Sequence, residues 1–316
     1  MVWVLGASGY IGTAFVRQLE ARRIRHRAIS RSTFDYTDYR FFSRHLASEK
    51  PDFVIQAAGF TGRPNVDACE TMRAETVSGN LCLTLAVAIA CAEKGVQMGH
   101  VSSGCIFTGA KIQSEAGLWQ VTESLTDPLV AQLLAERSAR MAGFRETDLP
   151  NFTFHQNNCS FYSGVKALTE EALQKFPGFF VWRLRIPFDE QKEARNYLMK
   201  VQSYPKIYQN WNSLSHREDF VKACLDLWEK GAPAGTYNLT NPGYVSTQEV
   251  VDQIQRRLRP DWQPVFWRDD GEFYRLGAKT PRSNCILDCE KAAQAGVRLR
   301  PVGEALLDAL DRWPTE

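Results

Sequence analysis

The N-terminus of the chain carries the pattern that most restricts its fold. An apolar run from Met1 to Leu5 precedes Gly6-Ala7-Ser8-Gly9-Tyr10-Ile11-Gly12, and an amphipathic stretch follows and ends near Arg22. A short strand, a glycine turn and a helix form a cradle for a dinucleotide pyrophosphate, because glycine lets the backbone approach the phosphates and the helix N-terminus presents free N–H groups. The turn reads GxxGxxG instead of the commoner GxGxxG, so an ordinary glycine turn is the alternative interpretation. The expected cofactor contacts here are Gly6, Ser8, Gly9, Tyr10, Ile11 and Gly12.

Strand-like and helix-like segments alternate through the first part of the chain. Strands are expected at residues 2–5, 26–29, 52–57 and 97–102, and helices at 11–22, 41–46 and 76–94. This rhythm predicts an α/β protein with a Rossmann-type, doubly wound parallel sheet.

The rhythm stops at an insertion, residues 108–150, in which residues 128–141 are expected to form an amphipathic helix. Residues 1–185 are predicted to form the cofactor-binding Rossmann domain, which includes this insertion. Residues 186–316 are predicted to form mainly a smaller C-terminal substrate-binding lobe, with some segments returning to the Rossmann domain. Helices are expected in this lobe near 219–230, 247–258 and 304–312.

Composition narrows the classes of partner. The 316 residues carry a formal net charge of +2 with no basic stripe, which argues against nucleic acid. No apolar stretch reaches the roughly 18 residues of a membrane helix, so no membrane partner is expected. The eight cysteines form no CxxC pair and no signal peptide precedes them, which predicts reduced thiols in a cytoplasmic protein. The five histidines stand in no ligand-like motif, and we expect no metal site.

The end of the second predicted strand bears on the choice of dinucleotide. Ser30, Arg31 and Ser32 stand there, and no acidic residue is present to bind a ribose 2′-OH. A guanidinium pairs well with a 2′-phosphate, so NADP is favoured over NAD. A solvated surface arginine is the alternative interpretation. Asp35 and Tyr36 are candidates for the adenine pocket.

A second signal lies far along the chain, in Tyr162-Ser163-Gly164-Val165-Lys166. The phenol and the ammonium stand four residues apart, on one face of a predicted helix. This spacing suits a proton donor whose pKa is lowered by a neighbouring cation, and Lys166 is also expected to hold the nicotinamide ribose. Ser103 follows the strand at 97–102 and is expected to bond to a substrate carbonyl. With the cofactor turn, these residues predict nicotinamide-dependent carbonyl chemistry.

The glycine turn, Asn80, Ser103, Tyr162 and Lys166 together resemble the extended short-chain dehydrogenase/reductases, which act on nucleotide sugars. Within that superfamily the chain resembles the bifunctional 3,5-epimerase/4-reductases of nucleotide-rhamnose synthesis and the 4-dehydrorhamnose reductases. The matching stretches run in consistent order over nearly the whole chain, at residues 57–67, 104–107, 150–153, 160–163, 195–197, 240–243 and 281–284. Gln56 departs from the asparagine that is usual in the family, and the segment at 108–150 is longer than expected.

The resemblance implies a set of roles. A cysteine and a lysine, matching Cys105 and Lys200, exchange protons at C3 and C5 of a 4-keto sugar. Tyr162 then protonates the oxygen at C4 and Ser103 steadies it, while Asn80 orders the proton path. The implied cofactor is NADP(H), with further contacts from Ala57, Ala58 and Gly59. The implied substrate is a nucleotide sugar held by Arg63, Asn65, Cys105, Ser160, Arg185, Asn196 and Arg282. A homodimer formed by helices that flank the sheet is expected.

Two other readings stay open at this point. The alternatives to the bifunctional enzyme are a reductase that needs a separate epimerase and a non-catalytic NADP-binding subunit, since a fold does not determine a function. A sugar 4,6-dehydratase is disfavoured, because Gly104 and Cys105 occupy the place of the expected Asp-Glu pair. The sequence leaves open whether the sugar carries UDP, dTDP or GDP.

Overall fold

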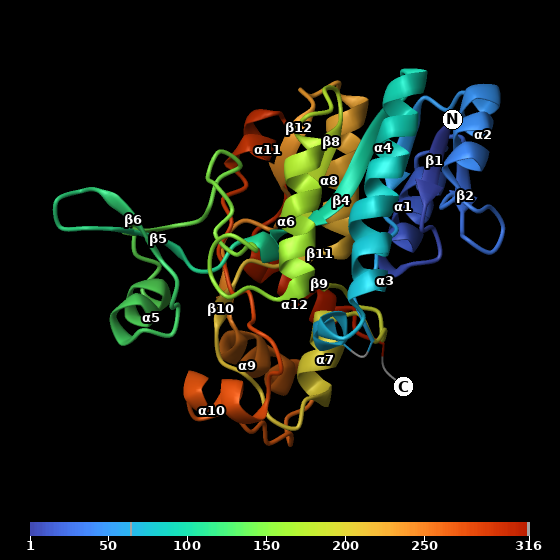
Figure 1. Cartoon of the computed structure of the whole chain (residues 1–316). Helices are drawn as coiled ribbons and strands as arrows, with labels where there is room; N and C mark the ends of the chain where they lie inside the picture. Colours follow the sequence, from blue (N-terminus) through green and yellow to red (C-terminus); the bar gives the residue numbers. More distant parts are fainter. Residues whose placement is uncertain (64, 315–316) are drawn as a thin grey trace.

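A six-stranded parallel sheet forms the centre of the molecule (Figure 1). The structure is a computed structural model, and it describes residues 1–63 and 65–314. The strands of the sheet are β1 (Val2–Leu5), β2 (His26–Ile29), β3 (Phe53–Gln56), β4 (Gln97–Ser103), β8 (Phe180–Leu184) and β12 (Gly235–Asn238). They lie in the order β12-β8-β4-β3-β1-β2, which confirms the predicted doubly wound α/β sheet. The order reverses at β1, so the crevice between the carboxyl ends of β1 and β3 is the expected ligand site.

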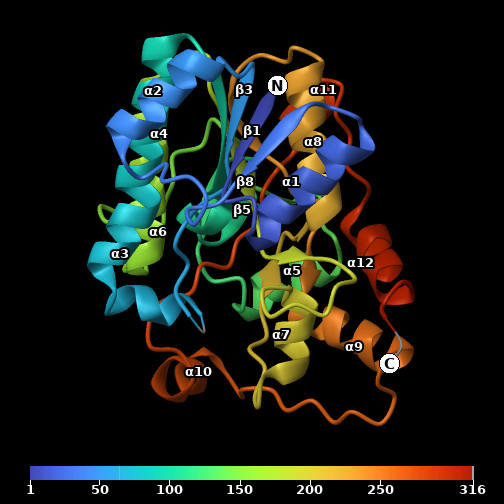
Figure 2. The same ribbon diagram turned by 90° about the vertical axis from the view of Figure 1, so that its right-hand side faces the viewer.

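Alternate side chains of the strands explain the layers. Val2 and Val4 face one core and Trp3 and Leu5 face the other, so β1 reads as a continuous apolar run. Helices α1 (Tyr10–Ala21) and α8 (Arg217–Glu229) cover the first face. Helices α2 (Tyr39–Glu49), α4 (Leu83–Lys94) and α6 (Phe161–Leu173) cover the second. Figure 2 shows the sheet edge-on between these two layers.

The helix that was predicted at 76–94 is longer and interrupted. It consists of α3 (Arg73–Val77), a π-helical turn at Ser78–Cys82 and α4. The whole run, Arg73–Lys94, is long and apolar enough to cross a membrane by length and composition, so the expectation that no apolar stretch reaches this length is wrong. In this fold it packs against α2 and α6 and supplies Val87 and Cys91 to the core, as a core helix of a doubly wound sheet does.

The C-terminal half builds a second core. It is formed by α7 (Tyr197–Ser203), α9 (Thr247–Arg257), α12 (Val302–Asp311), β9 (Pro187–Phe188) and β13 (Val245–Ser246). The same half also contains α10 (Asp270–Leu276), β10 (Trp211–Asn212) and β11 (Ser215–His216). Helix α11 (Glu290–Gln294) packs on β12, and its Ala292 lies in the core that contains Val2 and Val4. Strand β9 pairs with β11, and β10 pairs with β13. Strand β12 and helix α8 also come from this half but lie in the layers of the main sheet. The division at residue 185 stays a prediction.

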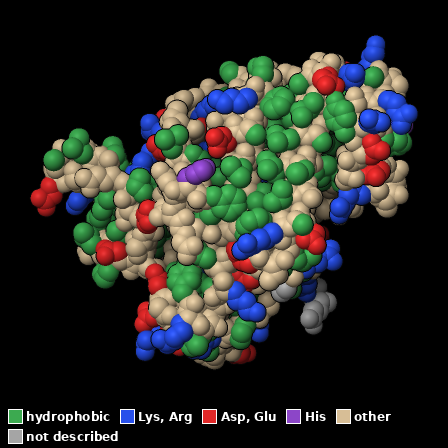
Figure 3. Space-filling model, in the orientation of Figure 1, with side chains coloured by type: hydrophobic (Ala, Val, Ile, Leu, Met, Phe, Trp, Pro, Cys, Tyr) green, Lys and Arg blue, Asp and Glu red, His purple; other side chains and the backbone are tan. Residues whose placement is uncertain are grey.

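The insertion at residues 108–150 forms a small sheet of β5 (Ala110–Gln113), β6 (Trp119–Thr122) and β7 (Met141–Ala142), beside helix α5 (Pro128–Ala135). The helix predicted over 128–141 is therefore wrong in its second half. The backbone of Arg137 takes a left-handed conformation (φ 53°), which a right-handed helix does not accommodate, and β7 then pairs with β5. Figure 3 shows apolar side chains on the projecting arm, where Leu118 and Trp119 are exposed.

Candidate active site

The glycine turn has the shape of an anion cradle. Gly6 has a positive φ of 75°, and a Cβ placed on it would lie 2.7 Å from Ala58 Cα. A Cβ on Gly12 would lie 2.0 Å from the carbonyl oxygen of Gly6. Helix α1 starts after Gly9 without a side-chain cap, which leaves its first N–H groups available to an anion. The turn therefore fits the pyrophosphate of a dinucleotide.

The other predicted residues of the turn differ in exposure. Ser8 and Gly9 are exposed at the rim, and Ile11 is half-buried. The Tyr10 hydroxyl donates a hydrogen bond to Oδ1 of Asp189 at 2.9 Å, so its side chain reaches towards the C-terminal half.

Beyond β2, the groups that were predicted to select the dinucleotide lie together. Arg31 is exposed, and its charge acts to lower the pKa of both Asp35 and Tyr36. Hydrogen bonds from Thr37 are the main cause of the lowered pKa of Asp35, whereas burial raises the pKa of Tyr36. The hydroxyls of Ser30 and Ser32 are 2.8 Å apart. This end of the crevice presents the exposed guanidinium of Arg31 to a ligand.

Three predicted catalytic side chains meet at the end of β4, where the short helix Gly104–Ile106 begins. The Ser103 hydroxyl oxygen accepts a hydrogen bond from the Cys105 backbone N–H at 3.2 Å. Tyr162, from α6, packs against the buried cluster that contains Cys105. Burial raises the pKa of the Cys105 thiol, while hydrogen bonds to Ser103 and Ser163 oppose the rise. Ser103, Cys105 and Tyr162 therefore share one site.

The predicted effect of Lys166 on Tyr162 is wrong in this structure. Burial raises the pKa of Tyr162 well above its ordinary value, the neighbouring Cys105 adds to the rise, and Arg195 is the cation that opposes it. The Lys166 ammonium lies instead 3.2 Å from Nε2 of His100 and 3.3 Å from the Val101 carbonyl oxygen. Both of these partners belong to β4. Burial lowers the pKa of Lys166 itself.

Lys200 lies in α7, and the charge of Arg195 acts on both Lys200 and Tyr162. Burial lowers the pKa of Lys200, and the charge of Arg195 lowers it further. The same Arg195 acts on Tyr162 and donates to the Gly62 carbonyl at 2.9 Å. Sequence reasoning missed Arg195, although the stretch Arg195-Asn196-Tyr197 belongs to the resemblance and contains the only signal for it.

Asn80 lies in the π-helical turn and holds the loop that follows β3. Its amide donates to the carbonyls of Phe60 and Thr76, both at 2.8 Å, and its oxygen accepts from the Phe60 N–H at 3.3 Å. Gln56 acts in the same region, because its side-chain oxygen accepts from the Ala58 N–H at 2.9 Å. These contacts place Ala57, Ala58 and Gly59 beside the glycine turn. A role of Asn80 in a proton path stays a prediction.

The predicted substrate contacts fall into two groups. Arg63 is exposed, and Arg282 forms an ion pair with Asp67 at 2.6 Å between Nη1 and Oδ1. Asn65 caps the short helix Val66–Glu70 by accepting from the Asp67 N–H at 2.8 Å, and Ser160 caps α6. Pro64 lies outside the described residues.

Arg185 and Asn196 form hydrogen bonds with other residues of the chain. Arg185 donates to Oδ1 of Asn212 at 2.6 Å and to the Ser283 carbonyl. Asn196 is fully buried, and its amide is held on both sides, with a donated bond to Asp189 and an accepted bond from the Leu198 N–H. Their contact with substrate stays a prediction.

Comparison with known proteins identifies the family. Residues 1–131 match the family model described as RmlD substrate binding domain. A bifunctional dTDP-4-dehydrorhamnose 3,5-epimerase/dTDP-4-dehydrorhamnose reductase of Arabidopsis thaliana is 30% identical over 312 residues, which cover 96% of this chain and 90% of that protein. The chain belongs to this dehydrorhamnose epimerase/reductase family.

Solved structures agree with the dehydrorhamnose epimerase/reductase fold over nearly the full length. The L780 UDP-rhamnose synthase of Acanthamoeba polyphaga mimivirus superimposes with a TM-score of 0.80 at 24% identity, covering 99% of each chain. A dTDP-4-dehydrorhamnose reductase of Bacillus anthracis, solved in complex with NADP, gives a TM-score of 0.73 at 18% identity and covers 99% of this chain and 97% of that one. At these identities the likeness is one of fold.

Proposed function

We propose that this chain is an NADPH-dependent oxidoreductase that reduces C4 of a nucleotide-linked 4-keto-6-deoxyhexose and also epimerises C3 and C5, giving a rhamnose-type nucleotide sugar. The observation that carries the proposal is the convergence of Ser103, Cys105 and Tyr162 at the end of β4, with Arg195 acting on both Tyr162 and Lys200. The activities in the name of the Arabidopsis relative support it.

The chain's own groups would hold the cofactor at three points. The glycine turn and the first turn of α1 take the pyrophosphate, because only glycine fits at Gly6 and Gly12. Arg31 takes the 2′-phosphate, and Lys166 takes the nicotinamide ribose. NADPH, when bound, supplies the hydride for C4.

Replacing Arg31 by Ala tests the phosphate contact. We expect the ratio of kcat/KM for NADPH to that for NADH to fall about tenfold or more, the loss of one charge-assisted contact.

The opposite pKa shifts of Lys200 and Cys105 suit the two groups to different roles in the epimerisation. A 4-keto group acidifies the C–H bonds at C3 and C5, and inversion requires a base on one face of the ring and an acid on the other. Because its pKa is lowered, Lys200 has a larger neutral fraction than an ordinary lysine, and its neutral amine removes the proton. Cys105, with its raised pKa, keeps its proton near neutrality and returns one to the opposite face.

The reduction uses Tyr162 as proton donor. Burial keeps the phenol protonated, and the Arg195 charge stabilises the phenolate that forms when the proton leaves. Ser103, whose hydroxyl lies at the end of β4, steadies the oxygen at C4. This division leaves Tyr162 and Ser103 to the reduction, and Cys105 and Lys200 to the epimerisation.

One set of assays separates this function from its alternatives. The protein is incubated with NADPH and the UDP-, dTDP- and GDP-linked 4-keto-6-deoxyhexoses, and the product stereochemistry is determined by NMR. We expect NADPH oxidation and a rhamnose configuration with at least one of the three. Cofactor binding without turnover on any of them would instead favour the non-catalytic subunit.

The epimerase assignment has its own test in Cys105→Ser. We expect exchange of the C3 and C5 hydrogens with deuterated solvent to slow by about a hundredfold, since a serine hydroxyl is a much weaker acid than a thiol. Exchange at the wild-type rate would leave the chain a reductase that needs a separate epimerase.

We further propose that the enzyme works in the cytoplasm on a soluble nucleotide sugar, as a homodimer through the outer face of α4 and α6. Ile89 of α4 is exposed on that face. Light scattering of the purified protein tests the assembly: an Ile89→Glu variant should shift a dimer to a monomer, and a monomeric wild type would contradict the dimer.

A further inference from the structure

Three side chains outside the reacting groups join the two halves of the molecule. The Tyr10 hydroxyl, at the start of α1, donates to Oδ1 of Asp189 at 2.9 Å. The other oxygen of Asp189 lies 2.6 Å from Nε of Arg217. Arg217 closes the circle, because its Nη1 donates to the Tyr10 carbonyl at 3.2 Å and its guanidinium lies 4.3 Å from the Tyr10 ring centroid. Each of the three side chains thus contacts the other two.

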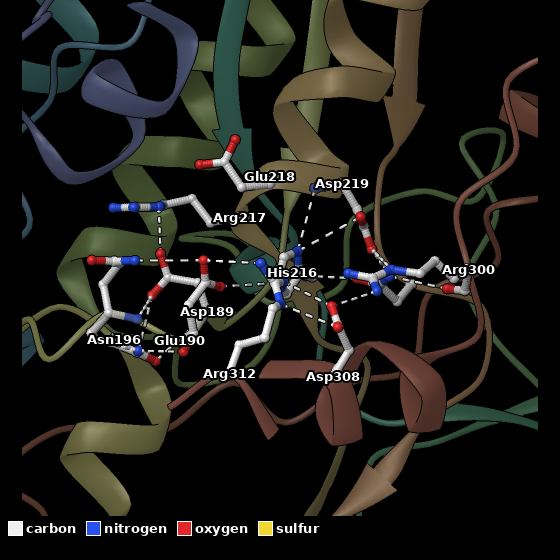
Figure 4. Close-up of polar contacts among 12 residues, drawn as sticks. Asp189, Glu190, Asn196, His216, Arg217, Glu218, Asp219, Arg300, Asp308 and Arg312 are labelled. Atoms are coloured by element: carbon white, nitrogen blue, oxygen red, sulfur yellow. Dashed lines mark hydrogen bonds and ion pairs between the residues drawn. The ribbon is translucent and has the colours of Figure 1, made fainter. Parts of the chain in front are cut away.

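The circle continues into α7, the helix that carries Lys200. Asn196 donates to the side-chain oxygen of Asp189 at 2.9 Å and to its carbonyl at 2.6 Å. The same Asn196 caps α7 by accepting from the Leu198 N–H at 3.0 Å, and the Lys200 N–H donates to the Asn196 carbonyl at 3.1 Å. Figure 4 shows Asp189 between Arg217 and Asn196. One chain of polar contacts therefore runs from the cofactor turn to the backbone of Lys200.

Burial makes this arrangement specific. Asp189, Arg217 and Asn196 are all fully buried, and a buried charge is tolerated only when its partner is held in place. Burial raises the pKa of Asp189, while Arg217 and the Tyr10 hydrogen bond oppose the rise. A buried pair of this kind contributes little net stability compared with apolar packing, so its geometry is the property to explain.

We propose that Tyr10 and Asp189 are positioning residues that fix the first turn of α7, and with it Lys200, relative to the cofactor turn. The inference rests on the proposed function and adds to it two residues that touch neither proton-transfer partner. Asp189 accepts one hydrogen bond from the Tyr10 hydroxyl and another from the amide of Asn196, the residue that caps α7. A shift of this contact moves the amine that serves C3 and C5 but leaves Tyr162, on α6, in place.

The variant Tyr10→Phe removes only the hydroxyl and keeps the ring under the Arg217 guanidinium. Two substrates report on it: the 4-keto-6-deoxyglucose nucleotide, which needs epimerisation before reduction, and the already epimerised 4-keto-rhamnose nucleotide, which needs reduction alone. We expect kcat on the first substrate to fall about fivefold more than kcat on the second, because a small misplacement of a proton-transfer group is costly. Equal falls on both substrates, or none on either, would overturn the inference.

Two further sets of variants complete the test. Tyr39→Phe is the matched control, because the Tyr39 hydroxyl also donates to a carboxylate, that of Glu93 at 2.6 Å, on the far side of the sheet. It should leave the ratio of the two kcat values at the wild-type level. Asn196→Ser retains a residue that caps helices but loses the amide link to Asp189, and it should change the ratio in the same direction as Tyr10→Phe.

Lys200→Met separates the inference from the function on which it rests. If Lys200→Met abolishes epimerisation while Tyr10→Phe and Asn196→Ser keep the wild-type ratio, the positioning role is wrong and the proposed function stands. If Lys200→Met epimerises at the wild-type rate, the assignment of Lys200 is wrong and the positioning role falls with it.

Discussion

At the scale of single residues, Arg195 connects two of the proposed catalytic groups, because its charge acts on both Lys200 and Tyr162. Removing a nearby positive charge makes protonation of an amine easier and raises its pKa. In Arg195→Gln the pKa of Lys200 therefore rises. The rate of deuterium exchange at C3 and C5 grows with the neutral fraction of Lys200, so the acid limb of its pH profile should move to higher pH.

The control for this shift is Arg256→Gln, which removes an exposed guanidinium from α9. It should leave the acid limb where it is in the wild type. If the acid limb of the exchange profile does not move in Arg195→Gln, or moves equally in both variants, the charge of Arg195 does not control the pKa of Lys200.

His100 offers a prediction about stability and pH. Burial lowers the pKa of His100 well below its ordinary value, and Lys166 lowers it further, so the native state keeps this ring neutral. The unfolded chain protonates it near about pH 6.5. Below that pH the unfolded state binds more protons, and the free energy of unfolding falls as the pH is lowered. Urea denaturation of His100→Gln should show a shallower fall, by up to about 1.4 kcal/mol per pH unit.

The comparison for His100→Gln is His155→Gln, since His155 is exposed. That variant should follow the wild-type dependence between pH 7 and pH 5. The same dependence in His100→Gln would mean that His100 already carries a proton in the native state.

At the scale of elements, the glycine turn couples stability to cofactor binding. A Cβ on Gly12 would lie 2.0 Å from the Gly6 carbonyl oxygen, so Gly12→Ala must push α1 away from β1. We expect a loss of a few kcal/mol in unfolding free energy, in the range of overpacked core positions, and a weaker Kd for NADPH by fluorescence titration. Gly303→Ala is the control, because nothing lies within 4 Å of its added Cβ and alanine favours the helix α12.

The same element shows what the sequence could predict. Strand β2 has the expected bounds of 26–29 and α1 begins one residue early, because apolar runs and glycine turns are local signals. The groups at the end of β4 were predicted for a similar reason, since parallel strands end at one edge. The role of Arg195 and the position of the Lys166 ammonium were not, because both depend on side chains brought together from distant segments.

At the scale of the whole molecule, polar contacts close the loop after β3 onto the C-terminal half. Arg282 pairs with Asp67 through two nitrogens, at 2.6 and 2.8 Å. Beside this pair, Glu70 accepts from the Thr280 hydroxyl at 2.7 Å and from the Phe161 N–H at 2.8 Å. A diphosphate that bonds to Arg282 therefore competes with Asp67 for the same guanidinium. The ion pair and the proposed substrate contact are alternatives within one site.

Because of this competition, we expect substitutions of Asp67 and Arg282 to change the Kd for a nucleoside diphosphate in opposite directions. In Asp67→Asn the guanidinium loses its carboxylate, and the Kd for UDP or dTDP measured by calorimetry should fall about threefold or more, the worth of a partly exposed ion pair. In Arg282→Gln it should rise by a similar factor or more, because a charge-assisted phosphate contact is lost. Asp261→Asn, on an exposed loop, should leave the Kd unchanged. If both Asp67→Asn and Arg282→Gln weaken binding, Arg282 serves to hold the two halves together and does not contact the diphosphate.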